Sequence, residues 1–107
     1  MQFSLTMNKV ALFVRHTAKP GQREKIKAVW SSFVKPRVEE NEAHELYYFC
    51  YDNKNENVVS VFQLFSSQKS MEQFMAGSWY PEYLRQVSNL ISEEPVICDA
   101  TPIWNKA

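Results

Sequence analysis

The stretch HELYYFCYDNKNENVVSVFQLF, residues 44–65, decides the fold of this chain of 107 residues. Its two ends, residues 44–52 and 58–65, are rich in aromatic and β-branched side chains, which favour strands. The asparagine-rich segment NKNEN, residues 53–57, lies between them and is typical of a turn. The sequence therefore predicts an antiparallel β-hairpin at the centre of the chain.

The segment before the hairpin predicts a strand followed by a helix. Residues 8–16, NKVALFVRH, form a short apolar run suited to a strand, and Pro20-Gly21 indicates a turn after it. Pro36 is expected to end or kink the helix, because proline cannot donate the backbone hydrogen bond. Residues 22–35 show helical spacing of apolar side chains, with one stripe made of Ile26, Val29, Trp30, Phe33 and Val34.

Two short helices and a strand are predicted after the hairpin. Ser67 suits the N-cap of a helix over residues 68–76. Ser78 is predicted to cap a second helix that has Pro81 near its first turn. Residues 95–104, PVICDATPIW, predict a closing strand. The inner face of the second helix is expected to carry Tyr83, Leu84, Val87, Leu90 and Ile91.

The order of these elements is β-α-β-β-α-β, which is the ferredoxin-like α+β arrangement of an antiparallel sheet with helices on one face. A length of 107 residues fits one domain, residues 1–107. Met7 is a second methionine near the start, so we expect residues 1–7 to be a loose N-terminal extension.

Both faces of the two hairpin strands carry apolar side chains, and helices on one face of the sheet cover only one of these sets. Large apolar patches are rarely left exposed on monomers, so a second copy of the sheet is the simplest cover for the set of side chains that the helices leave uncovered. We therefore expect a two-fold homodimer packed sheet to sheet; the alternative is that these aromatics are only partly buried. In the strand over residues 44–52, one face carries Leu46, Tyr48 and Cys50, and the other carries Tyr47, Phe49 and Tyr51. In the strand over residues 58–65, one face carries Val58, Phe62 and Leu64, and the other carries Val59, Val61 and Phe65.

Composition excludes several functions. Lysine and arginine together number 12, as do aspartate and glutamate, so the formal net charge is zero. A neutral chain is not suited to nucleic acid or to an anionic membrane surface as a main partner. Gly21 and Gly77 are the only glycines, and no glycine-rich phosphate-binding motif is present.

The cysteines and histidines give no metal-binding pattern. Cys50 and Cys98 lie in apolar runs, and we interpret them as small core residues rather than as a disulfide or a reactive thiol. No H-x-x-x-H or C-x-x-C spacing is present, so no metal site is predicted. Without a signal peptide or a long apolar run, the chain is expected to be cytoplasmic.

Taken together, the segments KPGQREKI, FVKPRVEEN, LYYFCYD, VVSVFQLF and SSQKSMEQFMAGSWYPEYL resemble the antibiotic biosynthesis monooxygenase (ABM) family, from about Lys9 to Ile103. The resemblance implies a dimeric α+β barrel with a pocket between the helices and the sheet of each subunit. It also implies oxidation of an aromatic or quinol-like substrate by O2, with no metal or flavin cofactor.

The resemblance also implies site residues, and at three of these positions the chain differs from the usual family pattern. Phe65 stands where the family often has tryptophan after the third strand. Phe74 and Trp79 stand where it often has histidines, so the residues most suggestive of proton handling are replaced by rings. Tyr80 keeps the following aromatic, and Tyr47 corresponds to the hairpin tyrosine.

Arg15 is the candidate for stabilising an anion. It shares a strand face with Ala11 and Phe13, and if that face points at the helices, Arg15 lies at the pocket mouth beside the substrate-binding Phe13. A guanidinium there would stabilise a phenolate or enolate. The alternative is a solvated arginine at the strand end, paired with a carboxylate.

Gln63 and Tyr47 are the candidates for orienting substrate oxygens. Gln63 interrupts an apolar face, and its amide must find partners in the backbone or in a ligand. Tyr47 offers a phenol that either donates to a carbonyl or packs with its hydroxyl at the rim. His16 and His44 are interpreted as hydrogen-bonded surface residues at strand ends, although His44 is placed to reach the pocket edge.

The sequence thus predicts that Phe65, Phe74, Trp79 and Tyr80 hold a flat ring system, while Tyr83 is core. The leading hypothesis is a cofactor-independent monooxygenase acting on a quinol or a polycyclic phenol. A second hypothesis is a non-catalytic domain that binds or senses a small molecule. A third is an isomerase of a small carbonyl signal on the same scaffold.

Overall fold

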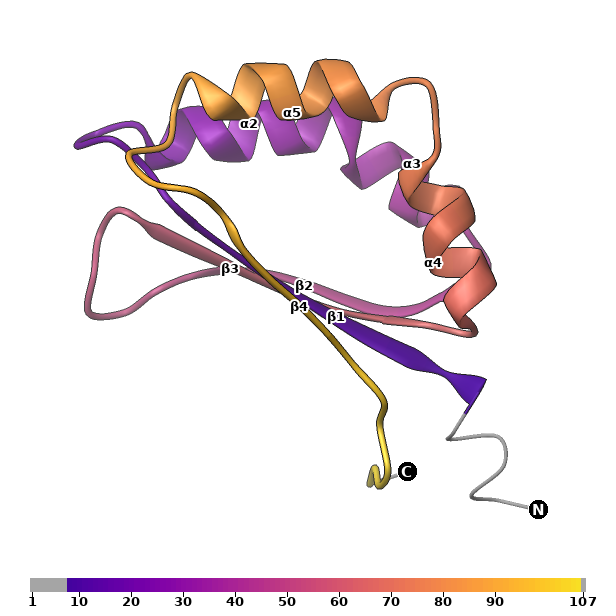
Figure 1. The fold of residues 1–107 in the computed structure, drawn as a ribbon. Coiled ribbons are helices and arrows are strands. Elements are labelled where there is room, and N and C mark those ends of the chain that lie inside the picture. Colours follow the sequence, from indigo (N-terminus) through magenta and orange to yellow (C-terminus); the bar gives the residue numbers. More distant parts are fainter. Residues whose placement is uncertain (1–7, 107) are drawn as a thin grey trace.

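The computed structural model describes residues 8–106, so the extension expected over residues 1–7 lies outside the described residues. Its order of elements confirms the ferredoxin-like prediction, and its helices cover one face of a four-stranded antiparallel sheet of order β2-β3-β1-β4 (Figure 1). The elements are β1 (Val10–Thr17), α2 (Arg23–Phe33), α3 (Lys35–Glu40), β2 (His44–Tyr51), β3 (Val58–Phe65), α4 (Gln68–Met75), α5 (Tyr80–Ser88) and β4 (Val96–Ala100).

The central hairpin is formed by β2 and β3, as predicted. Side-chain hydrogen bonds hold its turn: the Asp52 carboxylate accepts from the backbone N–H groups of Lys54, at 2.9 Å, and Asn55, at 2.7 Å. The Arg23 guanidinium of α2 donates to the carbonyl oxygens of Asp52, Asn55 and Val58 at 3.1–3.2 Å. These bonds satisfy backbone groups that a turn leaves without ladder partners and fasten the hairpin to the first helix.

Pro36 divides the long predicted helix into α2 and α3. It occupies the first turn of α3, where the missing N–H group is not needed. Ile26 and Val34 of the predicted stripe are buried, and its other members are half-buried. Trp30 packs against β2, whereas Phe33 packs against Tyr83 of α5.

Ser67 caps α4, as predicted. Its hydroxyl accepts from the Ser70 N–H at 3.0 Å, and the Ser70 hydroxyl accepts in return from the Ser67 N–H at 3.1 Å. The predicted cap at Ser78 is wrong. Trp79 is the N-cap of α5, and the turn is closed by the backbone instead, with the Tyr80 N–H bonding to the Gly77 carbonyl at 3.0 Å.

The cap at Ser67 gives a first prediction. Ser67→Ala is expected to lower the free energy of unfolding by about 1 kcal/mol, because the N–H groups of the first turn lose their acceptor. Urea denaturation followed by circular dichroism measures the change. Ser78→Ala is the matched control, since the exposed Ser78 caps no helix, and an equal loss in both variants would contradict the assignment.

In β1, the residues that face the helices are not the ones that the prediction placed there. Directly paired residues share a face, and Leu12 pairs with Gln63 while Ala11 pairs with Leu64. The helix-covered face therefore carries Val10, Leu12, Val14 and His16, together with Val59, Val61, Gln63 and Phe65. Phe13 and Arg15 lie on the opposite face, because packing under the helices selected the set that contains Val10 and Leu12.

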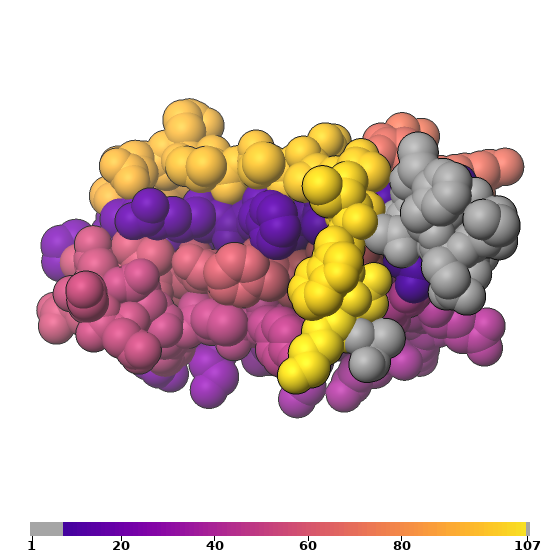
Figure 2. Space-filling view, turned by 90° about the horizontal axis from the view of Figure 1, so that it is seen from below, coloured from indigo at the N-terminus to yellow at the C-terminus, as the bar shows by residue number. Residues whose placement is uncertain are grey.

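The face opposite the helices, seen in Figure 2, is here called the open face, and several large apolar side chains are exposed on it. Strands β4, β1, β3 and β2 run side by side across it, and the C-terminal segment crosses them. Cys98 is exposed on this face, so the prediction of a core residue there is wrong, and Cys50 is half-buried. Its large exposed apolar side chains are Phe13, Leu46, Tyr48, Phe62 and Val96.

The closing strand is shorter than predicted. β4 ends at Ala100, and residues 101–104 continue without strand pairing. Ile103 and Trp104 are 85% and 77% exposed, so they contribute nothing to the core of this chain.

Candidate functional site

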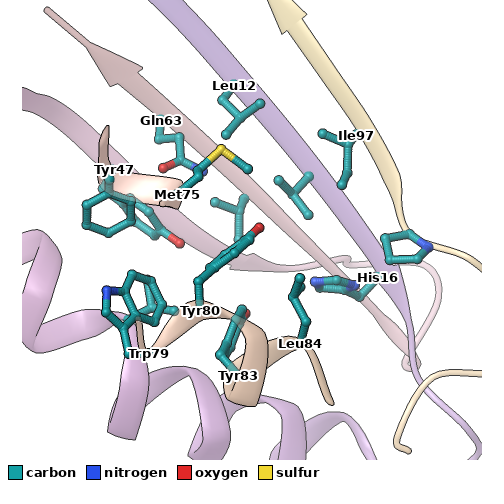
Figure 3. Close-up of a pocket in the computed structure, with 15 residues that line it drawn as sticks. Leu12, His16, Tyr47, Gln63, Met75, Trp79, Tyr80, Tyr83, Leu84 and Ile97 are labelled. Atoms are coloured by element: carbon teal, nitrogen blue, oxygen red, sulfur yellow. The ribbon is translucent and has the colours of Figure 1, made fainter. Parts of the chain in front are cut away.

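A cavity lies between the helix-covered face of the sheet and the helices α4 and α5 (Figure 3). Its volume is about 60 Å³, and most of its wall is apolar. The lining residues are Leu12, Val14, His16, Val34, Tyr47, Val61, Gln63, Phe74, Met75, Trp79, Tyr80, Tyr83, Leu84, Pro95 and Ile97. These include five of the site residues named from the sequence: Tyr47, Gln63, Phe74, Trp79 and Tyr80.

Arg15 and Phe13 are not at this cavity. Both lie on the open face, where Phe13 packs edge-on against Phe62 with ring centroids 5.8 Å apart. The candidate for anion stabilisation is therefore corrected, and none of the cavity-lining residues is a lysine or an arginine. Any charge that develops on a ligand in this cavity must be stabilised by neutral donors.

Phe65 is part of the core behind the cavity rather than of its wall. It is fully buried with Val10, Leu12 and Met71, because its position at the end of β3 lies under α4. Its ring centroid is 4.1 Å from that of His44. Phe65 thus supports the site by packing and does not face a ligand.

His44 orients the amide of Gln63. Asn41 Nδ2 can only donate, so at 2.9 Å it makes Nδ1 of His44 the acceptor. Nε2 of His44 then carries the proton and donates to Oε1 of Gln63 at 2.8 Å. Within residues 8–106 the amide nitrogen of Gln63 makes no protein hydrogen bond, so its N–H groups are available to the cavity.

Tyr47 offers a second donor. The indole N–H of Trp30 donates to its hydroxyl oxygen at 2.8 Å, which leaves the phenol proton free. Burial raises the pKa of Tyr47 to about 12, although the Trp30 hydrogen bond lowers it, so the phenol keeps its proton at neutral pH. Trp30 was expected only as part of a buried stripe, and its role in orienting Tyr47 was missed.

Two more tyrosines contribute hydroxyl groups from α5. Burial raises the pKa of Tyr80 and of Tyr83, so both remain protonated. Figure 3 shows the hydroxyls of Tyr47, Tyr80 and Tyr83 directed into the space between the sheet and α5. Tyr83 is buried, as predicted, and it also lines the cavity.

Trp79 forms one end of the cavity. Its ring packs edge-on against Phe74, at 5.3 Å between centroids, and the Arg37 guanidinium covers it at 4.8 Å. Gly77 permits this position, because a Cβ atom there would come within 2.2 Å of the Trp79 indole nitrogen. Arg37 was not identified from the sequence, and its contact with Trp79 restrains the wall of the cavity.

His16 is the lining residue that sequence reasoning interpreted wrongly. It is 5% exposed, and its Nδ1 atom has no hydrogen-bond partner within residues 8–106. An unpartnered buried polar atom costs about 1–3 kcal/mol. The signal that could have found it is its alternation with Val14 and Leu12, which places all three on one face.

Two further findings concern residues 8–106 alone. They contain no group of three or more histidine, cysteine, aspartate or glutamate side chains that could hold a metal ion. No helix among them has the length and apolar character needed to span a membrane.

Comparisons with known proteins identify the fold. No protein-family model matches the sequence, and no curated protein sequence matches it. A candidate antibiotic biosynthesis monooxygenase from Caulobacter crescentus superposes with a TM-score of 0.83 at 11% identity, over 94% of this chain and 95% of that one. A second such candidate, from Bacteroides thetaiotaomicron, gives a TM-score of 0.78 at 14% identity, over 92% and 93% of the two chains.

The chain has the ABM fold.

A protein of unknown function from Nitrosomonas europaea shares this ABM fold, with a TM-score of 0.76 at 22% identity over 95% of this chain and 96% of that one. At these identities the likeness concerns the fold alone. Within the ABM fold, the cavity of this chain lies where the resemblance implied a pocket, between the helices and the sheet. The chemistry of the site therefore has to be argued from its own residues.

The two histidines of the site predict how stability depends on pH. Burial lowers the pKa of His16. Burial also lowers the pKa of His44, and this effect is larger than the opposing one of the hydrogen bond to Gln63. In the unfolded chain both take up protons near pH 6.5. Stability is therefore full above about pH 6.5 and falls as the pH drops toward the folded values, by at most about 1.4 kcal/mol per pH unit for each histidine.

Urea denaturation at pH 7.5, 6.5 and 5.5 measures this dependence. His16→Phe is expected to flatten the profile, because one of the two groups that take up a proton on unfolding is removed. A wild-type profile that stays level, or that rises toward pH 5.5, would contradict the assignment.

Proposed function

We propose that the chain is a cofactor-independent monooxygenase that oxidises a small quinol or phenol with O2. The observation that carries this proposal is the oriented amide of Gln63, whose N–H groups are left to an apolar cavity by the chain Asn41–His44–Gln63. The likeness in fold to candidate antibiotic biosynthesis monooxygenases supports it. The cytoplasmic location expected from the sequence belongs to the same proposal.

For this reaction the protein has to position the substrate and to stabilise the negative charge that develops on it. In an anthrone-type substrate, the acidic ring methylene loses a proton and passes an electron to O2. One oxygen atom then enters the product as a carbonyl, and the other leaves as water with the two methylene hydrogens. Neutral donors held in an apolar site stabilise the oxyanion of such a substrate more strongly than water-exposed donors do.

Gln63 and Tyr47 supply these donors. They are directly paired across β2 and β3, so their side chains lie on the same face of the sheet. The amide N–H and the phenol O–H are both free of protein acceptors within residues 8–106. Together they bind one substrate oxygen, while Phe74 and Trp79 pack against the ring.

The cavity must widen to admit a ring. Its 60 Å³ is less than half of the roughly 150 Å³ of an engineered cavity that binds benzene. Met75 is an unbranched, adaptable side chain, and Leu84 is 40% exposed, so these two lining residues move at the lowest cost. We therefore expect Met75 and Leu84 to move when a substrate ring binds.

Oxygen uptake by the purified protein with a panel of quinols and anthrone-like phenols tests the proposal. Gln63→Leu is expected to lower kcat/KM by about 10²–10³, the usual effect of removing one oxyanion donor. Arg15→Ala is the matched control, because Arg15 lies on the open face, and it is expected to keep wild-type kinetics. Uptake no faster than the autoxidation of the substrates would contradict the proposal.

The homodimer belongs to the same proposal. The open face carries Phe62, 42% exposed, and Tyr48, 61% exposed, beside each other on β3 and β2. A self-complementary apolar face of this kind is suited to a two-fold, sheet-to-sheet contact. The cavity lies on the other face of the sheet, so each subunit holds its own site.

One observation favours a non-catalytic binding domain as the second candidate. The shifted pKa values of the lining tyrosines and of His16 keep all of these groups neutral at pH 7, so the cavity holds no strong base. A substrate then has to supply its own acidity. Saturable binding of the same panel without oxygen uptake would establish this candidate.

A further inference from the structure

His16 is a buried polar group whose Nδ1 atom has no hydrogen-bond partner among residues 8–106. It lies near the end of β1, opposite Val59 of β3, and its ring closes the end of the cavity away from Trp79 (Figure 3). Buried polar nitrogens are nearly always hydrogen-bonded in folded proteins. A buried nitrogen without a partner therefore indicates a role other than stabilising the fold. The position of His16 in the wall of the cavity connects that role to a ligand.

A second cavity begins at the same residue. It has a volume of about 370 Å³ and lies between α5 and the segment that leads into β4. The inner cavity, described above, and this outer cavity share His16, Leu84 and Pro95 as wall residues. The inner cavity is too small for a ring, whereas the outer one has the size of an ordinary small-molecule site.

Leu84 separates the two cavities. It lines both, and at 40% exposure its side chain is free to take another rotamer without breaking the core. Its neighbours on the inner face of α5, Tyr83 and Val87, are buried and fixed by packing. Of the three shared wall residues, Leu84 is therefore the one whose movement we expect to join the cavities into one continuous site.

We propose that the inner and outer cavities form one ligand site joined at Leu84, in which the imidazole of His16 hydrogen-bonds the hydroxyl of a planar phenol or enol. The class of ligand rests on the proposed function. Once Met75 and Leu84 have moved, the apolar ring enters the widened inner cavity toward Tyr80 and Trp79. Its substituents extend into the outer cavity.

The charges around His16 define these substituents. Glu93 and Glu94 line the outer cavity, and the Glu93 carboxylate accepts from the Thr17 hydroxyl at 2.8 Å. Two carboxylates disfavour an anionic substituent and favour hydroxyl or amino groups. From α5 the titratable groups at the inner cavity are Tyr80 and Tyr83, while the lining residues from β3 and β4 nearest the junction are apolar.

The imidazole is suited to accept a hydrogen bond from a hydroxyl donor. Burial lowers the pKa of His16, so the ring is neutral at pH 7 and keeps one acceptor nitrogen. A ligand hydroxyl that donates to this nitrogen, or accepts from the other, gives the ring a partner that the described part of the chain does not provide.

Binding of 1-naphthol and naphthalene under anaerobic conditions tests the proposal, because neither probe needs to be turned over. The wild-type protein is expected to bind 1-naphthol at least about tenfold more tightly than naphthalene, the worth of one hydrogen bond. His16→Phe is expected to lower this preference by about tenfold while it still binds naphthalene. Arg15→Ala, one residue away on the opposite face, is expected to keep it.

A second measurement covers the case in which His16→Phe does not fold. In wild-type protein labelled with ¹⁵N, the imidazole resonances of His16 are expected to shift with 1-naphthol and not with naphthalene. The His44→Gln variant has no imidazole other than that of His16, so its spectrum assigns the resonances of the two histidines. Leu84→Trp, which fills the junction, is expected to weaken the binding of both probes.

Equal affinity of the wild-type protein for the two probes, or a preference that is unchanged in His16→Phe, would overturn the proposal. An absence of binding would overturn it together with the proposed function. Hydroxyl-selective binding without oxygen uptake would instead support the role of His16 and remove the oxygenase activity alone.

Discussion

Replacing Phe65 by alanine is expected to lower the free energy of unfolding by about 3–5 kcal/mol, the largest effect of any single substitution considered for stability. Phe65 is fully buried, and its ring packs against His44 and Phe74 with centroid separations of 4.1 and 5.9 Å. Alanine would leave a cavity among Val10, Leu12 and the rings. Domains are stable by only about 5–15 kcal/mol, so the variant is expected to lie near its unfolding threshold.

Urea denaturation at a fixed protein concentration measures this loss, and Phe65→Leu is the matched control. Leucine keeps most of the volume and is expected to cost less than about 1.5 kcal/mol. If Phe65→Ala cost no more than Phe65→Leu, the ring would not be part of a closely packed core. Phe65 would then return to consideration as a wall of the ligand site.

Replacing Phe62 by glutamate is expected to abolish the proposed homodimer. Phe62 belongs to β3, as Phe65 does, but it lies on the open face, beside Phe13 and Tyr48. A carboxylate placed at the centre of an apolar interface must be desolvated without a partner, which costs several kcal/mol. The dissociation constant is expected to rise by at least a factor of about 100.

Sedimentation equilibrium measures the outcome: twice the chain mass for the wild type and 12.6 kDa for Phe62→Glu. Lys27→Glu, on the exposed outer side of α2, is the control for an added carboxylate and is expected to remain dimeric. A wild-type protein that sediments at 12.6 kDa would contradict the dimer, and the open face would then be a surface for another partner.

The hairpin could be predicted from the sequence because its signals are local. Aromatic and β-branched residues fill both strands, and the polar segment between them fits a turn that Asp52 completes through its own side chain. Ser67 was predicted for the same reason, since a cap and its partner Ser70 lie three residues apart. The prediction that Ser78 caps α5 was wrong because Trp79, whose ring packs over Gly77, is the N-cap of that helix.

The site was harder to predict because it depends on which face of β1 turns toward the helices. Val10, Leu12 and Val14 compete with Ala11 and Phe13, and both sets are apolar, so alternation alone does not choose between them. The wrong choice brought Arg15 to the site and left His16 at the surface. The contact of Trp30 with Tyr47, across 17 residues of sequence, has no local signal at all.

Oxidation of an anthrone-type phenol under ¹⁸O2 tests the central claim most directly. The account predicts a product whose new carbonyl carries a single labelled oxygen atom, formed at a rate that falls by about 10²–10³ in Gln63→Leu. It also predicts that chelators and the absence of added flavin leave this rate unchanged. Unlabelled product, or a label incorporated at the same rate with and without the protein, would show that the cavity binds its ligand without oxidising it.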